Sequence, residues 1–297
     1  MVGEVLIKTL NELTKFGIVI FVLICATAGY ALGYRLEQHF SPFHLLQLLL
    51  GIGLLSSGSF ALNQIQEVSI DLKMPRTRNR PLPSGRMSLV QAGFIAGLFL
   101  GSGLVLLFLL KPLVGFLGLA TVLLYNVCYT MYWKPKWVFG AVPGAIPGAM
   151  PVVIGYATTN SDILSRECIY AFLIMFLWQM PHYWSLAIKF QEDYRKGGVP
   201  TLPVSIGSHA TLYHIGLYVF GYVGLALLSP WFVPSKYIYL LFVVPFCFKV
   251  FQEFYKYQKN DGAKNWLPFF MWTNLSMLVF LIAPVVDKWI EVASNIR

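Results

Sequence analysis

The chain has 297 residues, of which 57% are hydrophobic and only 12% are charged, about half the charged fraction of an ordinary soluble domain. This composition argues against a soluble globular protein, and at about 20 apolar residues per bilayer crossing little length remains for domains outside a membrane. The 22 Lys and Arg residues exceed the 13 Asp and Glu residues, but in so apolar a chain we interpret the excess as a sign of membrane topology and expect no nucleic-acid partner.

Nine apolar stretches of roughly bilayer-spanning length follow one another, and we predict that each crosses the membrane as a helix. We therefore expect an all-α membrane protein of about nine transmembrane helices, in which residues 1–297 form a single transmembrane domain. The first stretch lacks the features of a cleaved signal peptide, so we expect it to be retained. The predicted spans are Phe16–Tyr34, His44–Leu62, Leu89–Leu110, Val114–Tyr132, Val138–Ala157, Cys168–Ile188, Leu212–Val233, Tyr237–Phe251 and Leu267–Val286.

The distribution of basic residues predicts the orientation. If the N-terminus is cytoplasmic, 16 of the 22 Lys and Arg residues fall on the cytoplasmic side, as the positive-inside rule favours. The N-terminal segment contains Glu4 and Glu12 and no Arg, unlike a mitochondrial transit peptide. We predict a multi-pass protein of a bacterial inner membrane, with the N-terminus cytoplasmic and the C-terminus external.

A polar segment with acids followed by cations comes after the second span. Asn63, Glu67 and Asp71 are spaced by four, so their oxygens share one face if the helix continues through Asp71. Such hard oxygen ligands suit Mg²⁺ held jointly with substrate phosphates. Arg76 and Arg80 follow in a loop, and guanidinium groups match phosphate oxygens. The segment favours a metal-bound diphosphate over a positive-inside loop with one capping acid.

A second polar segment follows the sixth span and has a similar order of acid, base and Gly/Pro loop. On a continuous helix, His182, Lys189 and Asp193 fall within about 20° of one another. Asp71 and Asp193 are 122 residues apart, which is compatible with an old duplication. We predict that the two segments clamp a diphosphate between them.

Four side chains near span ends are considered for substrate contact. Tyr125 and Tyr129 share a helix face, although a tyrosine at the membrane interface is most often an anchor. Lys134 emerges on the same side as both acidic segments. His182 is either a hydrogen-bonded core histidine or a ligand of haem iron, and the residues alone leave both interpretations open.

Cysteines and paired glycines indicate packing rather than chemistry. The cysteines lie singly in apolar spans, so they predict neither disulfides nor a zinc site. The pairs Gly51/Gly53 and Gly101/Gly103 lie inside apolar runs, so we predict close helix contacts there and no nucleotide loop. The cysteines are Cys25, Cys128, Cys168 and Cys247.

Together these motifs resemble the UbiA superfamily of intramembrane prenyltransferases, and most closely its branch of protohaem farnesyltransferases, the haem O synthases. That branch adds three runs to the superfamily's two acidic segments, here within Met74–Leu82, Pro181–Trp184 and Asp193–Pro203. The resemblance extends from the second span to the seventh. Departures from the family pattern occur at Gln64, Glu67 and Glu192, and beside Lys134 at Pro135 and Trp137.

The resemblance implies a UbiA-like fold with a central cavity, Mg²⁺ and diphosphate at its cytoplasmic mouth and the prenyl tail inside. It implies transfer of farnesyl from farnesyl diphosphate to a vinyl group of protohaem IX, with water addition. Besides the lipid bilayer, a downstream haem A synthase or oxidase assembly factors become expected partners. The implied catalytic and Mg²⁺-binding residues are Asn63, Glu67, Asp71 and Asp193, and the implied substrate-binding residues are Arg76, Arg80, Lys134, Lys189, His182 and Tyr129.

Two alternatives remain open at this point. A UbiA-type enzyme that prenylates an aromatic quinone precursor shares the metal site, and only the Arg-Pro-Leu and Pro-His-aromatic-Trp runs argue against it. A haem or anion transporter would place ionisable groups near the membrane midplane, whereas the groups in this chain cluster at one face.

Overall fold

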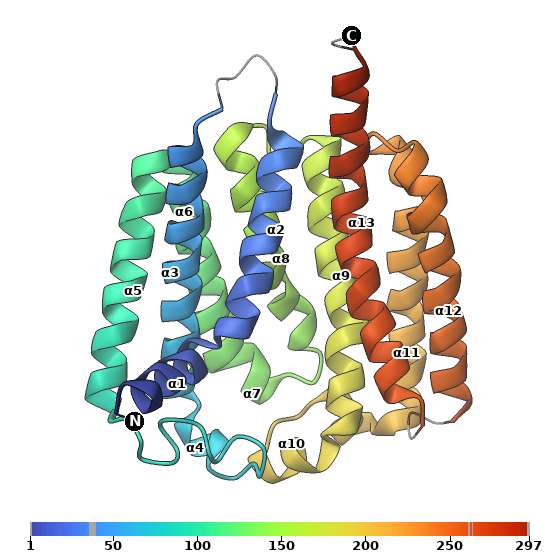
Figure 1. Cartoon of the computed structure of the whole chain (residues 1–297). Helices are drawn as coiled ribbons and strands as arrows, with labels where there is room; N and C mark the ends of the chain where they lie inside the picture. Colours follow the sequence, from blue (N-terminus) through green and yellow to red (C-terminus); the bar gives the residue numbers. More distant parts are fainter. Residues whose placement is uncertain (1, 36–39, 261, 263, 296–297) are drawn as a thin grey trace.

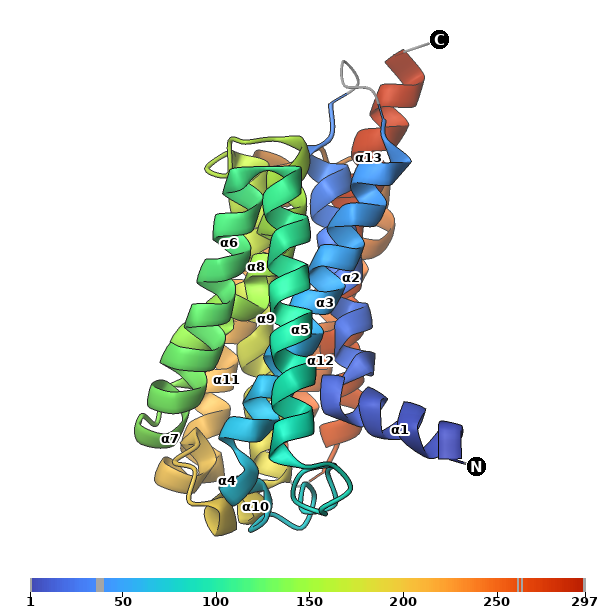
Figure 2. The ribbon, with the colours of Figure 1, turned by 90° about the vertical axis from the view of Figure 1, so that its left-hand side faces the viewer.

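The computed structural model describes residues 2–35, 40–260, 262 and 264–295, which contain helices and no strand. Long helices stand side by side, and short helices lie across the lower end of the bundle (Figures 1 and 2). The helices are α1 (Val2–Thr14), α2 (Phe16–Gly33), α3 (Pro42–Gln66), α4 (Val68–Asp71), α5 (Leu89–Leu110), α6 (Pro112–Val122), the π-helix η1 (Leu123–Trp133), α7 (Lys134–Lys136), α8 (Ala141–Thr159), α9 (Arg166–Lys189), α10 (Gln191–Gly197), α11 (Leu202–Leu227), the 3₁₀ turn η2 (Ser229–Trp231), the π-helical η3 (Tyr239–Val243), α12 (Val244–Lys259) and α13 (Trp266–Asn295).

The predicted spans coincide with long helices, and the protein is an all-α, multi-pass membrane protein. In the described part of the chain, seven helical stretches are long and apolar enough to cross a membrane. The other two predicted spans, Cys168–Ile188 and Tyr237–Phe251, fall on α9 and on η3 with α12, which stand beside the rest (Figure 1). The count of nine stays a prediction. The seven are Phe16–Gly33, Pro42–Gln66, Leu89–Leu110, Pro112–Lys136, Ala141–Thr159, Leu202–Leu227 and Trp266–Ser294.

The helix α1 lies across the lower end of the bundle and is joined to α2 by a single residue (Figure 2). That residue, Lys15, has φ 51° and ψ 49°, the left-handed conformation that residues other than glycine rarely adopt. Leu13 is fully buried in a cluster that includes Ala61 of α3 and Ala92 of α5. Because α1 is packed there, the sharp turn at Lys15 is held in place.

Glycine lets α3 and α5 pack closely. A Cβ on Gly103 would lie 2.6 Å from the backbone nitrogen of Leu55, and one on Gly51 would lie 2.7 Å from Cδ2 of Leu107. The predicted close packing is confirmed at these two glycines. At Gly53 a Cβ would make only an ordinary contact, 3.7 Å from Cδ2 of Leu23. The prediction is wrong at Gly101, where a Cβ would have open space.

In both polar segments the long membrane helix, α3 or α9, ends where the acidic residues begin. Glu67 ends α3 with φ −104° and ψ 8°, and Phe190 ends α9 with φ −112° and ψ 30°. The expected continuous helices through Asp71 and Asp193 are therefore wrong. Each acid lies on a short helix, α4 or α10, at the lower end of the bundle (Figure 1). The breaks keep both acidic segments at the mouth of the bundle instead of letting them project beyond it.

Candidate active site

A cavity of about 460 Å³ lies inside the bundle. Much of its wall is apolar, with side chains such as Ile52, Leu55 and Met175. Its charged side chains all come from the ends of helices or the loop after α4, at the lower end in Figure 1. Four are cationic and two are carboxylates, so that end of the cavity favours an anion. They are Lys15, Glu67, Asp71, Arg76, Arg80 and Lys134.

Eight of the ten predicted site residues line this one cavity. They come from segments far apart in the chain, including α3, the loop after α4, η1 and α9. Asp193 and Lys189 are absent from the wall. The eight are Asn63, Glu67, Asp71, Arg76, Arg80, Tyr129, Lys134 and His182.

Glu67 and Lys134 form a buried ion pair between the end of α3 and α7. The Lys134 Nζ lies 2.5 Å from Oε1 of Glu67, whose residue is only 3% exposed. Burial alone would raise the pKa of Glu67, but the ammonium of Lys134, assisted by Lys15 and Arg80, brings that pKa below its usual value. Glu67 is therefore held as a carboxylate.

Asp71 and Arg80 form the second buried pair. The Arg80 Nη1 donates to both carboxylate oxygens of Asp71, at 2.8 and 3.0 Å, and Asp71 is fully buried. The Thr77 hydroxyl donates to the Asp71 carbonyl at 3.1 Å, which fixes the turn between the two. The loop after α4 thus supplies the cation that compensates the acid of α4.

Lys15 is a member of the site that the sequence analysis missed. Its ammonium donates to Oδ1 of Asn63 at 2.9 Å and lies 5.3 Å from the ring centroid of Phe60. Burial, together with the charge of Arg80, lowers the pKa of Lys15 to about 7. In the sequence it is one more basic residue beside a span, and nothing in that pattern distinguishes it from an ordinary topology signal.

The π-helix η1 shapes the wall beside α3. The side chains of Tyr125 and Tyr129 stack with centroids 5.9 Å apart, which confirms their predicted shared face, and both line the cavity. Thr130 accepts from Nδ2 of Asn63 at 3.2 Å and donates to the Tyr125 carbonyl at 2.9 Å. Such wide helical turns occur often at functional sites, and this one orients the amide of Asn63.

The two polar segments contact each other. The backbone N–H of Arg76 donates to Oδ2 of Asp193 at 3.3 Å, and Nε of Arg76 lies 4.0 Å from the same oxygen. The Arg76 guanidinium covers the ring of Phe190 at 4.9 Å. Asp193 is therefore connected to the cavity through Arg76.

Three tyrosines from different helices extend this connection. Tyr129 of η1, Tyr183 of α9 and Tyr194 of α10 all line the cavity. The rings of Tyr183 and Tyr194 pack edge to face with centroids 6.4 Å apart, so α9 and α10 contact each other at the cavity wall.

The second polar segment is arranged differently from the prediction. Lys189 places its ammonium 5.6 Å from the ring centroid of Trp266. His182 lines the cavity. Because the helix breaks at Phe190, the expected common face of His182, Lys189 and Asp193 is wrong.

The oxygen donors fit Mg²⁺ in their chemistry. Asn63, Glu67 and Asp71 supply hard oxygens around one cavity, the type that Mg²⁺ prefers. In the described residues no three His, Cys, Asp or Glu side chains are gathered as a preformed metal site. Each of the three oxygen donors already accepts from a cation. A metal ion would therefore take the place of ammonium and guanidinium groups.

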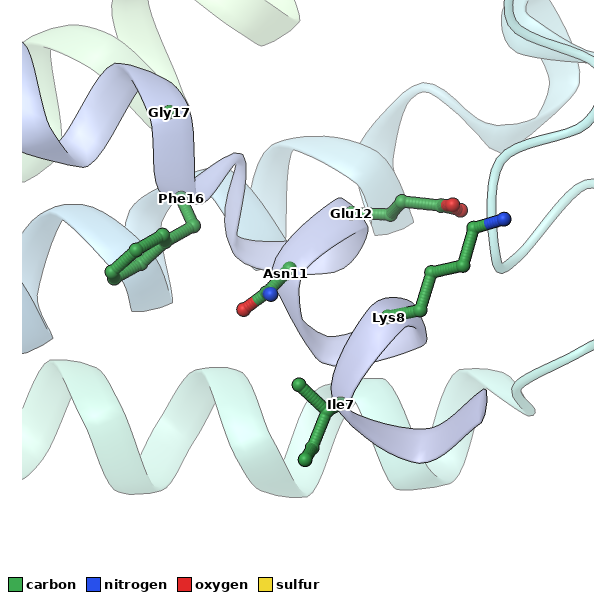
Figure 3. Close-up of a pocket in the computed structure, with 6 residues that line it drawn as sticks. All are labelled: Ile7, Lys8, Asn11, Glu12, Phe16 and Gly17. Carbon is green, nitrogen blue, oxygen red and sulfur yellow. The ribbon is translucent and has the colours of Figure 1, made fainter. Parts of the chain in front are cut away.

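A second hollow lies along α1 and the first turn of α2 (Figure 3). It is lined by Ile7, Lys8, Asn11, Glu12, Phe16 and Gly17. Glu12 is engaged by Arg86. This hollow is open and has one residue of each charge, so it resembles an ordinary surface groove more than a reaction site.

Comparison with known proteins places the chain among prenyltransferases. The sequence profile of the UbiA prenyltransferase family matches residues 22–275. A protein of Bdellovibrio bacteriovorus named protoheme IX farnesyltransferase is 54% identical over 96% of this chain and 97% of its own length. A protein of the same name from Leptospira interrogans is 33% identical over 90% of this chain and 93% of its own.

Solved structures support the same fold. A structure described as digeranylgeranylglyceryl phosphate synthase is similar with a TM-score of 0.75 and 19% identity, covering 94% of this chain and 98% of that one. A UbiA homologue from Archaeoglobus fulgidus, solved with DMAPP and Mg²⁺, has a TM-score of 0.66 and 16% identity, covering 94% and 99%. At these identities the likeness establishes the fold alone.

Lys15 predicts a pH dependence of stability. Below about pH 7 the buried ammonium is charged in both the folded and the unfolded chain, whereas between about 7 and the usual 10.5 the unfolded chain alone keeps the proton. Stability therefore rises with pH in this window. We expect the thermal midpoint of substrate-free protein in detergent to rise from pH 7 to pH 9, and to rise less in Lys15→Met. Lys8→Met, at an exposed position of α1, is the control, and equal slopes for Lys15→Met and wild type would contradict the assignment.

Proposed function

Because the chain belongs to the UbiA prenyltransferase family, we propose that it transfers the farnesyl group of farnesyl diphosphate to a vinyl group of protohaem IX. The supporting observation is an apolar cavity with an anion-attracting end, in a chain 54% identical to a protein named for that reaction. Residues 1–297 act as one transmembrane domain in this proposal.

The cations at the charged end bind the diphosphate. Arg80 and Lys134 engage the carboxylates of Asp71 and Glu67, Lys15 engages the amide oxygen of Asn63, and all three cations line the cavity. Negative charge builds on the diphosphate as the bond to farnesyl C1 breaks, and preorganised cations stabilise that charge more than they stabilise the ground state. Arg76, stacked on Phe190, is positioned to contact the outer phosphate.

The residues that would hold Mg²⁺ are Asn63, Glu67 and Asp71, whose side-chain oxygens accept hydrogen bonds from these cations. Asp193 of the second polar segment would join them. When bound, Mg²⁺ supplies positive charge to the phosphate oxygens. With a metal ion on these carboxylates, Lys134 and Arg80 would be available to contact the diphosphate. Lys189 remains a predicted diphosphate contact, at the end of α9.

The rest of the cavity suits the farnesyl chain and the allylic cation. Its wall is largely apolar, and the faces of Phe60, Tyr125 and Tyr129 can stabilise a positive charge near the charged end. The vinyl carbon of protohaem forms a bond to farnesyl C1. Water then adds to the resulting cation and loses a proton, which leaves a hydroxyethylfarnesyl side chain.

The proposed location is a bacterial inner membrane with the charged end facing the cytoplasm. The loop after α4 carries Arg76, Arg78, Arg80 and Arg86, and basic loops remain on the cytoplasmic side. Farnesyl diphosphate, with its charged head, is then bound from the cytoplasm.

The reaction is tested by incubating the purified full chain with protohaem, farnesyl diphosphate and Mg²⁺. Mass spectrometry should detect protohaem whose mass has increased by one farnesyl group and one hydroxyl. A matched incubation with an aromatic quinone precursor in place of protohaem should give no prenylated product. Product from the quinone precursor alone would refute the proposal.

Arg80 and Arg78 provide a matched pair of variants. Arg80 lines the cavity and binds Asp71, whereas Arg78 is exposed. Arg80→Gln should raise the KM for farnesyl diphosphate and lower kcat by about 10²-fold, because its contact strengthens as the leaving group gains charge. Arg78→Gln should change kcat by less than about twofold. Equal and small effects at both positions would remove Arg80 from the site.

The orientation predicts the outcome of a reporter experiment. A reporter inserted after Gly85, in the loop at the lower end of the bundle, should be active in the cytoplasm. A reporter inserted after Ser161, in the loop between α8 and α9 at the opposite end (Figure 1), should be active outside. Reversed signals would invert the proposed topology.

A further inference from the structure

His182 is held in the cavity wall in one orientation. Its ring lies between the rings of Trp178 and Phe270, with both centroids at 4.8 Å. Its Nδ1 lies 2.8 Å from Oδ1 of Asn274 on α13. Both faces and one nitrogen are thus engaged, so the edge that carries Nε2 is the part left to line the cavity.

The partner of Nδ1 determines the tautomer. Asn274 donates its own amide, through Nδ2, to the Phe270 carbonyl at 2.7 Å, so its Oδ1 is the atom that faces His182. An amide oxygen accepts only, and Nδ1 must therefore carry the proton. In the neutral ring this leaves the lone pair on Nε2, for which no hydrogen-bond partner occurs among the described residues.

This arrangement is that of a metal-binding histidine. Histidines that bind metals almost always donate their other ring N–H to an oxygen, which fixes the tautomer and makes the free nitrogen more basic. We propose that Nε2 of His182 binds the iron of the protohaem substrate. The inference rests on the proposed function, because protohaem is the iron compound that this function brings into the cavity.

Iron binding at His182 would set the position of the reacting vinyl group. Tyr183, the next residue, lines the same cavity as Tyr129 and the charged residues. A porphyrin anchored through its iron at His182 therefore extends its edge toward the end at which the diphosphate leaves. His182 donates an electron pair to iron and takes no part in bond breaking.

The test is spectroscopic and uses the purified full chain titrated with protohaem in the absence of farnesyl diphosphate. Wild-type protein should give the absorption spectrum of histidine-ligated haem, and an iron–histidine stretch by resonance Raman in the ferrous form. His182→Gly should lose both and bind protohaem at least about tenfold more weakly. Added imidazole should restore the spectrum, because it occupies the space left by the ring.

Two further variants separate ligation from general damage. His214→Gln alters a histidine that does not line the cavity and should leave the spectrum unchanged. Asn274→Leu keeps the ligand but removes the acceptor of Nδ1, so the iron–histidine stretch should shift to lower frequency and the affinity should fall about tenfold. A His182→Gly protein with the wild-type haem spectrum would overturn the inference.

Product analysis of the same preparations distinguishes this inference from the proposed function. Wild-type protein that farnesylates protohaem while its haem spectrum is independent of His182 would overturn iron binding and leave the function standing. Wild-type protein that binds haem through His182 but forms no farnesylated product would leave the ligand standing and overturn the function. A His182→Gln variant that keeps the wild-type spectrum yet loses turnover would also overturn iron binding, in favour of a role as base.

Discussion

Each carboxylate at the mouth of the cavity is compensated by a cation from another part of the chain. Glu67 is paired with Lys134 and Asp71 with Arg80, at 2.5 and 2.8 Å. Breaking such a buried pair by removing one partner costs about 3–5 kcal/mol. The end of α3, α4, the loop after α4 and α7 are therefore held together by charge, and the geometry of the anion site follows from the need to neutralise its own acids.

In the proposed function, the same ion pairs would allow the site to exchange partners while its charges stay neutralised. A diphosphate with Mg²⁺ would bring both signs of charge, so the metal would replace the cations on the acids and the phosphates would replace the acids on the cations. No buried charge would then be left alone, which would limit the desolvation penalty. A mouth built only of basic residues would bind the anion but would repel the metal.

Hydropathy and spacing were sufficient to predict the long helices and to select residues most of which line one cavity, because apolar length and acid–base order are local properties of the sequence. The site residues that were missed or misplaced depend on contacts between distant segments. Lys15 enters the site through a left-handed turn that is held by the packing of α1. His182 contacts Asn274, which lies 92 positions away in the sequence. The helix break at Phe190 has no neighbouring proline or glycine, the residues that usually mark such a break. No single-sequence pattern encodes these three features.

Two glycines of α8 keep the cavity wide beside its charged end. A Cβ on Gly144 would lie 2.4 Å from the ring of Tyr129, and one on Gly148 would lie 2.0 Å from Oε1 of Gln179. Both glycines line the cavity, as does Pro147 between them. Because the backbone of α8 itself forms this wall, Tyr129 can lie against it and leave the interior open. A methyl group at either glycine would push a neighbouring side chain into the space between the charged end and the apolar interior. The absence of side chains at these two positions of α8 therefore sets how much room the cavity has beside its charged end, which is the room that the proposed function requires for a large acceptor.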